Sequence, residues 1–277
     1  MIGVFLITIG TLFEELSFSV SKFAVRRRLE GINTIAVVNT FWSSIFFIIP
    51  LLTTPHERIL VLSSAWLLMI LVPLNVLQSY VTVHALARAT RSTFGFFRTL
   101  TIPLVLVVDA CLGYPLSVWQ VVGILLITGT LLFLYKNHGI NRRGLGLVLI
   151  TALNAVVTLS MFKYLISHGN GVAMVGMLNN IPILLVMMLF AISHKERPFR
   201  VAHRPLVLGQ SAALGVASIL TSYAYLFLNA SVAVALTRSI AVVWAIIVGR
   251  TAFHEKHLWI KVAGCVSLMI GMVCLAL

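Results

Sequence analysis

Long runs of apolar residues, separated by short polar breaks, recur along the whole chain. They lie at 2–24, 32–53, 60–86, 93–112, 117–135, 145–167, 172–192, 206–228, 231–252 and 258–277. A membrane-spanning helix needs about 20 apolar residues, so these runs are of a length that crosses a bilayer. No run alternates apolar and polar residues as the strands of a membrane barrel do. The pattern predicts an all-α membrane protein with ten transmembrane helices.

The composition argues against the soluble classes of protein. Only 10% of the 277 residues are charged and 60% are hydrophobic, whereas a soluble domain carries about 25% charged residues. The chain therefore lacks the polar surface of a soluble enzyme, a nucleic-acid-binding domain or a disordered tail. The net charge of +13 would by itself suggest binding to nucleic acid. The alternative is that the basic residues lie in short cytoplasmic loops of a membrane protein. The positions of these residues decide between the two interpretations.

Basic residues gather in the breaks that follow odd-numbered runs. The breaks after even-numbered runs hold only Arg58. Those after odd-numbered runs hold fifteen, the last of them just inside the tenth run: Arg26, Arg27, Arg28, Arg88, Arg91, Lys136, Arg142, Arg143, Lys195, Arg197, Arg200, Arg204, Arg250, Lys256 and Lys261. Lys and Arg are enriched in cytoplasmic loops. This asymmetry predicts that both termini lie outside, in what we expect to be a bacterial cytoplasmic membrane, and no nucleic-acid partner is expected.

Four basic residues lie within the runs rather than between them, namely Lys22, Arg98, Lys163 and Arg238. Arginine binds carboxylate or phosphate through two parallel hydrogen bonds, so Arg98 and Arg238 are the strongest candidates for substrate binding. The alternative is that these side chains snorkel to the headgroups, or that Lys22 extends the basic anchor beside it. Their depths in the runs suggest one Lys/Arg pair toward each face of the membrane.

Two acidic residues, Glu14 and Glu15, lie inside the first run. Glu15 shares a helical face with Ser19 and Lys22. A carboxylate in a membrane helix faces protein or a water-filled cavity, because exposure to lipid is costly. Glu14 or Glu15 is therefore a proton or substrate site, or Glu15 is the structural partner of Lys22 or of Arg98.

Further candidates for a substrate cavity are amides and aromatic residues within the runs: Asn39, Asn180, Tyr80, His84, Tyr223 and Tyr225. The alternatives are interhelical bonding for the Asn side chains, and packing or an interfacial belt for the aromatic ones. The stretch from His254 to His257 lacks the HExxH spacing of a zinc site. No catalytic motif is visible, so neither an enzyme nor a metal or other cofactor is expected, and proton coupling stays open.

The two halves of the chain resemble each other. A shift of 141 residues brings Lys22 onto Lys163 and Asn39 onto Asn180, and a shift of 140 brings Arg98 onto Arg238. Each half holds five predicted spans, and this odd number places the halves in opposite orientations. The sequence thus predicts two inverted repeats, 1–140 and 141–277, with a binding site at their interface, which is a frequent design of secondary transporters.

The end of each half resembles the drug/metabolite transporter superfamily in its ten-helix, EamA-like form. Residues 253–256, Phe-His-Glu-Lys, followed by Gly264 and Gly271, are similar to the family's Glu, basic residue and Gly-rich last helix. Residues 112–123 end the first half in a similar way, with Tyr114 in place of the usual Glu. The resemblance implies a central cavity lined by helices 1–4 and 6–9, with the fifth and tenth helices peripheral.

These features favour a secondary transporter of a small anionic or zwitterionic metabolite, amino-acid-like or phosphorylated, that works by alternating access. Two arginines in a low-dielectric cavity repel a cation strongly. The expected partners are this small molecule and the lipid bilayer, and a monomer is sufficient, although an oligomer is not excluded. The alternative is proton-coupled efflux of polyatomic cations or drugs through Glu14 or Glu15, because the first run also resembles that of small multidrug exporters. A membrane scaffold or lipid-handling enzyme is a third interpretation.

Overall fold

The computed structural model describes residues 1–26, 31–105, 117–137, 143–198, 204–228, 230–254 and 258–276. Within these ranges the secondary structure is helical, and no strand occurs. The long helices are α1 (Ile2–Arg26), α2 (Ile32–Thr53), α3 (Trp66–Arg88), α6 (Val118–Lys136), α7 (Leu145–Ser167), α8 (Val172–Ser193), α10 (Pro205–Phe227), α11 (Ala230–Thr251) and α12 (Leu258–Ala276). The shorter elements are η1 (Pro55–Arg58), η2 (Leu62–Ser64) and α4 (Arg91–Arg98).

Seven of the described helices, α1, α2, α3, α7, α8, α10 and α11, are long and apolar enough to cross a membrane. Shorter apolar stretches, Val121–Lys136 and Trp259–Cys274, lie in α6 and α12. Large apolar side chains cover the outside of the bundle, among them Trp66, Met69 and Trp259, which are 59%, 81% and 84% exposed. Soluble proteins rarely expose so large an apolar surface to water, whereas membrane proteins expose such a surface to lipid. The chain is therefore an α-helical membrane protein.

Two elements begin or end away from the predicted bounds. The third run was expected from residue 60, but α3 begins at Trp66, because the residues before it form η1 and η2. The fourth run was expected over 93–112, but α4 ends at Arg98 and helix resumes over 101–105. There the Thr99 and Thr101 hydroxyls bond the carbonyls three residues earlier, at 2.6 and 2.7 Å, and so compete with the helical bonds. The remainder of this run lies outside the described residues, as do Tyr114 and Glu255.

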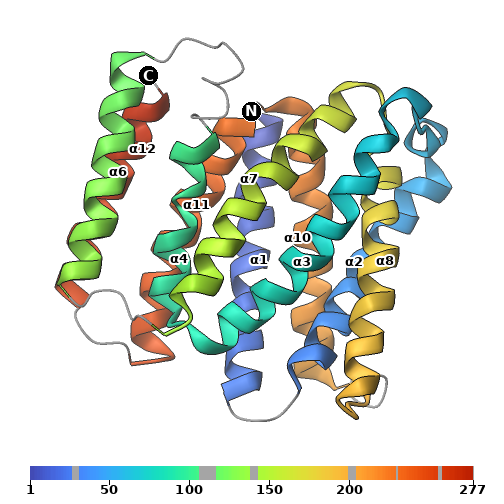
Figure 1. The fold of residues 1–277 in the computed structure, drawn as a ribbon, viewed down its shortest axis with the longest axis horizontal. Helices are drawn as coiled ribbons and strands as arrows, with labels where there is room; N and C mark the ends of the chain where they lie inside the picture. The colour runs from blue at the N-terminus through green and yellow to red at the C-terminus, as the bar shows by residue number, and fades with distance from the viewer. Residues whose placement is uncertain are drawn as a thin grey trace.

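The helices lie side by side in one bundle, and both chain ends are at the same edge of it (Figure 1). The main packed pairs include α1 with α10, α2 with both α8 and α10, α3 with α7, α4 with α11 and α6 with α12. Each of these pairs joins a helix from the first half of the chain to one from the second half. The α6–α12 pair stands at one side of the bundle, away from α2 and α8 (Figure 1). The centre of the molecule is therefore an interface between the two halves.

Close packing of α10 against α2 depends on Gly215. A Cβ atom at this position would lie 2.5 Å from the Phe46 ring and 3.1 Å from the backbone of Trp42. We expect Gly215→Ala to lower the thermal stability of the detergent-solubilised protein, at a cost of about 1–3 kcal/mol from overpacking. Gly209→Ala, on the same helix, has no atom within 4 Å of the added Cβ and should leave the melting temperature unchanged or raise it. Equal melting temperatures for both variants would contradict this packing.

Candidate functional site

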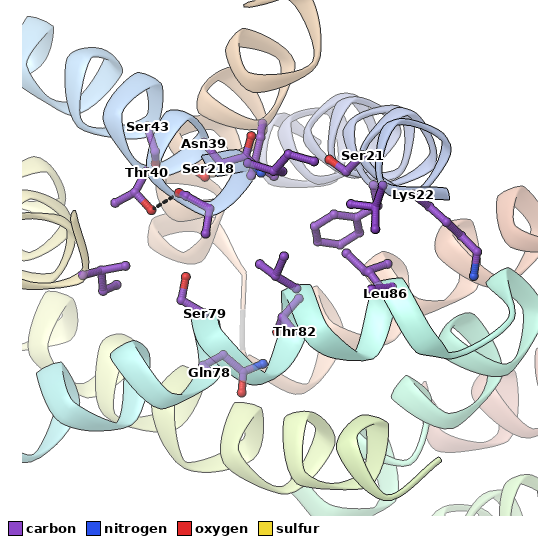
Figure 2. Close-up of a pocket in the computed structure, with 18 of the residues that line it drawn as sticks. Ser21, Lys22, Asn39, Thr40, Ser43, Gln78, Ser79, Thr82, Leu86 and Ser218 are labelled. Atoms are coloured by element: carbon purple, nitrogen blue, oxygen red, sulfur yellow. Dashed lines mark hydrogen bonds between the residues drawn. The ribbon is translucent and has the colours of Figure 1, made fainter. Parts of the chain in front are cut away.

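Two adjoining cavities lie between the halves of the chain. The larger, about 260 Å³, is bounded by α1, α2, α3, α8 and α10 and is drawn in Figure 2; we term it the vestibule. The smaller, about 200 Å³, is bounded by α1, α4, α7, α10 and α11 and is termed the inner chamber. Arg98, Leu214 and Ser218 line both cavities. The two cavities therefore adjoin at these three side chains.

The inner chamber contains two arginines and one carboxylate. Arg98 Nη1 lies 3.3 Å from Glu14 Oε1, with side-chain exposures of 11% and 18%. Arg238 is 3% exposed, and its Nε donates to the Thr101 hydroxyl at 3.2 Å. Within the described ranges, no carboxylate forms an ion pair with Arg238. The chamber thus holds one excess positive charge, removed from bulk water.

Aromatic packing fixes the position of Arg98. It is the last residue of α4, and its guanidinium lies over the rings of Phe18 and Phe94, at 5.6 and 5.1 Å from their centroids. The electron-rich face of an aromatic ring attracts a cation, most strongly where water is excluded. The short α4 therefore ends with its charge aimed into the chamber rather than at a membrane surface.

Glu15 forms a second ion pair, with Arg91, and both side chains are buried at 2% and 0% exposure. Arg91 Nε also donates to the Ser19 hydroxyl at 3.4 Å. Two expectations are wrong here. Arg91 is not a loop residue at the membrane surface, because α4 begins inside the bundle. Glu15 pairs neither with Lys22 nor with Arg98. Lys261, also counted among the loop charges, is likewise buried.

The two intramembrane lysines bond to the ends of helices. Lys22 Nζ donates to the carbonyl of Ala89, the C-cap of α3, and Lys163 Nζ donates to the carbonyl of Tyr225, near the end of α10. A cation is favourable there, since the carbonyls of the last turn lack helical partners. Of the expected Lys/Arg pairs, Lys22 and Arg98 line the vestibule together, whereas Arg238 lines the inner chamber and Lys163 is not among the described lining residues of either cavity.

Asn39 and Asn180 bond across helices and also line the vestibule. Asn39 Oδ1 accepts from Gln210 Nε2 and from the Ser211 hydroxyl, both at 2.8 Å, and so joins α2 to α10. Asn180 Nδ2 donates to the Ser43 hydroxyl at 3.2 Å, joining α8 to α2. The two predicted roles, interhelical bonding and cavity lining, therefore coincide in these side chains.

The predicted aromatic candidates lie in different surroundings. Tyr80 is 38% exposed and packs on His84 and Phe190, with ring centroids 4.2 and 5.4 Å apart. This position on the outer surface favours the packing interpretation for Tyr80 and His84. Tyr225 is 6% exposed and lines the inner chamber. The hydroxyl of Tyr223 faces the carboxylate of Glu57.

Sequence reasoning passed over several small polar residues of the site. Ser79, Thr82 and Ser218 line the vestibule, and Thr101 bonds Arg238. Serine and threonine are common in membrane helices, where most of them bond their own backbone. Their residue type therefore carries no signal of a cavity, and only the rotation of each helix reveals it. Among the described residues, no group of three or more His, Cys, Asp or Glu side chains could hold a metal ion.

The fold and the site define an α-helical membrane protein with a charged, polar cavity inside its bundle. No model of a known protein family matches the chain, and no curated protein matches it. The chemistry of the cavity therefore carries the functional argument.

Proposed function

We propose that the chain is a secondary transporter that carries a small anionic or zwitterionic metabolite through the central cavity by alternating access. The observation that carries this proposal is the inner chamber, where Arg98 and Arg238 lie beside Glu14, the one carboxylate among its described lining residues. Ionisable groups inside a membrane protein are costly and mark substrate or ion pathways. Two guanidinium groups facing one carboxylate attract an anion and repel a cation.

Two glutamates support an inverted repeat with ten spans. Glu57 accepts a hydrogen bond from the Ala173 amide at 2.8 Å, at the start of α8. Glu196 accepts one from the Thr34 amide at 2.6 Å, at the start of α2. The two acceptors, Glu57 and Glu196, are 139 residues apart in the sequence (196 − 57), and so are the two donors, Thr34 and Ala173 (173 − 34). Each half thus caps a helix N-terminus of the other half, as expected if 1–140 and 141–277 are inverted copies.

Helix packing follows the same relation. Exchanging the halves turns the α1–α10 pair into the α7–α3 pair, while α2–α8, α4–α11 and α6–α12 map onto themselves. The lysine bonds at the ends of α3 and α10 exchange as well. The side-by-side position of α6 and α12, outside the cavity, agrees with the peripheral fifth and tenth helices of EamA-like transporters. A two-fold axis in the membrane plane is the symmetry that alternating access requires of such a repeat.

The two ends of the cavity differ. The vestibule reaches the end of the bundle where α1 ends and α2 begins, with Val25 and Ile35 in its wall. At the other end the η1–η2 connection covers the turn between α7 and α8, through bonds from Gly171 N to Ile59 O at 2.9 Å and from Val61 N to Asn170 Oδ1 at 2.8 Å. Exposed basic residues are concentrated at the vestibule end: Arg88, Lys136, Arg143, Lys195, Arg197, Arg204 and Arg250. By the positive-inside rule, this is an inward-facing state.

The alternative, proton-coupled efflux of cations or drugs, requires a carboxylate that is free to receive a cation. Glu15 is bonded to Arg91 and Glu14 to Arg98. The positive charge of Arg238 beside them adds to the repulsion of a cationic drug. The geometry therefore favours the anion over the cation as substrate.

A thermal-shift screen of the purified wild-type protein tests this function. We expect amino acids, carboxylates or organic phosphates to raise the melting temperature, since a ligand at 100 times its Kd adds about 2.7 kcal/mol of stability. Quaternary ammonium ions should have no effect. Lys136→Gln removes an exposed positive charge remote from the cavity and should respond as the wild type does. Stabilisation by the quaternary ions alone would overturn the proposal.

A further inference from the structure

We propose that the ligand is a monoanion whose remaining body is polar and uncharged, such as a sugar acid, with its anionic group in the inner chamber and its body in the vestibule. This inference rests on the proposed function and adds the substrate class to it. Three features carry the inference: the unbalanced charge of the inner chamber, the unbonded hydroxyls of the vestibule, and the side chains that line both cavities.

The charge of the inner chamber sets the charge of the ligand. Of the five N–H donors of a guanidinium, Arg238 uses one within the described residues, toward the Thr101 hydroxyl. A buried charge without a counter-ion is costly, yet Arg238 is 3% exposed and lines the chamber. One carboxylate would bring Glu14, Arg98 and Arg238 to neutrality, whereas a phosphate monoester carries a charge of about −1.5 to −2 at neutral pH. A dianion would leave an excess negative charge in a low dielectric.

The vestibule is polar but nearly free of charge. Among the described residues, its charged lining residues are Lys22, whose Nζ donates to a backbone carbonyl, and Arg98. Its uncharged polar lining residues are Ser21, Asn39, Thr40, Ser43, Gln78, Ser79, Thr82, Asn180 and Ser218. No carboxylate is among the described lining residues, so these residues offer nothing to bind a second, cationic group. The vestibule fits a body that bonds through hydroxyls or amides.

Three of the vestibule hydroxyls have no hydrogen-bond partner among the described residues. In membrane helices, serine and threonine commonly donate to the carbonyl four residues earlier, as Thr40 does to Ala36 at 2.9 Å. Ser79, Thr82 and Ser218 make no hydrogen bond within the described parts of the chain. Figure 2 shows Ser79 directed from α3 across the open space toward Thr40 of α2. These hydroxyls are available to a ligand.

The two cavities are of a size for one small ligand that spans both. Volumes of about 260 and 200 Å³ are each below the roughly 300–1,000 Å³ of typical ligand pockets. Ser218 and Arg98 belong to both walls, so a molecule with its acid group beside Arg238 can extend past them to Thr82. A ligand with an apolar body would displace water from the unbonded hydroxyls without giving them hydrogen bonds. Burying unsatisfied hydroxyls in this way weakens binding.

Four matched compounds test the inference on the purified wild-type protein, with binding measured by thermal shift and calorimetry. D-gluconate has the predicted charge and body, hexanoate has the charge with an apolar body, D-glucarate carries two carboxylates, and D-glucose carries none. We expect gluconate to bind at least about 10-fold more tightly than each of the others, since a mismatch near 1.4 kcal/mol corresponds to that factor. Hexanoate or glucarate binding as tightly as gluconate, or gluconate not binding, would overturn the inference.

These outcomes separate the inference from the function on which it rests. Tight binding of hexanoate or glucarate leaves an anion transporter with a different substrate class. Binding of tetraethylammonium, with none of the three anions, overturns both proposals.

Conservative variants locate the body of the ligand. Thr82→Val keeps the shape of the side chain and removes its unbonded hydroxyl. It should weaken gluconate binding about 2- to 10-fold, the value of one neutral hydrogen bond, and leave hexanoate unchanged. Thr8→Val is the matched control, because Thr8 is not among the lining residues of either cavity and its hydroxyl bonds Val4 O at 2.8 Å. Equal losses in both variants, or a parallel loss of hexanoate, would show that Thr82 acts through the structure and would overturn this placement.

Discussion

Glu15→Ala and Arg91→Ala are each expected to lower the stability of the protein by roughly 3–5 kcal/mol, because removal of one partner leaves the other charge buried and uncompensated. We expect losses in the upper part of this range, because the two side chains are only 2% and 0% exposed. The Ser19 hydroxyl that bonds Arg91 Nε is buried too, so water cannot easily replace the lost carboxylate. Melting in detergent, followed by intrinsic fluorescence, measures the loss.

The double variant distinguishes a broken charge pair from a damaged core. Glu15→Leu combined with Arg91→Met removes both charges together and should recover much of the stability lost in either single variant, because apolar side chains of similar volume replace a buried pair at little cost. Arg88→Ala serves as the control, since Arg88 is exposed at the end of α3. Single variants that melt with the wild type would contradict the ion pair.

Hydropathy predicted the helices because a bilayer imposes one requirement on them, about 20 apolar residues that satisfy their own backbone bonds. Hydropathy did not predict the ends of helices where side-chain hydrogen bonds determine them. Residues 60–65 are apolar enough to extend α3, but they form η2 and the residues around it, anchored by Asn170 through the Ser64 hydroxyl at 2.8 Å. Likewise, the hydroxyls of Thr99 and Thr101 determine where α4 ends.

The charges of the site were located from the sequence, but their partners were not. A basic residue within an apolar run is visible in any sequence, which is why Arg98 and Arg238 were found. Arg91 stands three residues from the exposed Arg88 and was counted with it, because nothing in one sequence tells which side of α4 faces the bundle. Its partner Glu15 is 76 residues away. Such pairs depend on how helices rotate and pack, and that information lies in the contacts between helices.

The two arginines of the inner chamber should respond to mutation with opposite effects on stability. Arg98→Gln leaves Glu14 without its partner and should lower the free energy of unfolding by about 1–3 kcal/mol, less than for Glu15 because Glu14 is 18% exposed. Arg238→Gln removes a buried charge that forms no ion pair within the described residues, while the Glu14–Arg98 pair remains. This variant should melt at or above the wild-type temperature.

The same Arg238→Gln variant is expected to lose binding of D-gluconate by roughly 10- to 100-fold, because a hydrogen bond to a charged group contributes about 1.5–3 kcal/mol. Arg238→Lys keeps the charge without the planar guanidinium group, so its affinity for D-gluconate should lie between those of the wild type and of Arg238→Gln. Lys136→Gln should bind as the wild type does. Melting and calorimetry on the same samples decide between two roles. A stable Arg238→Gln protein that no longer binds the anion identifies a residue retained for its ligand at the expense of stability. A variant that unfolds as Arg98→Gln does would make Arg238 a structural residue and remove the charge on which anion recognition depends.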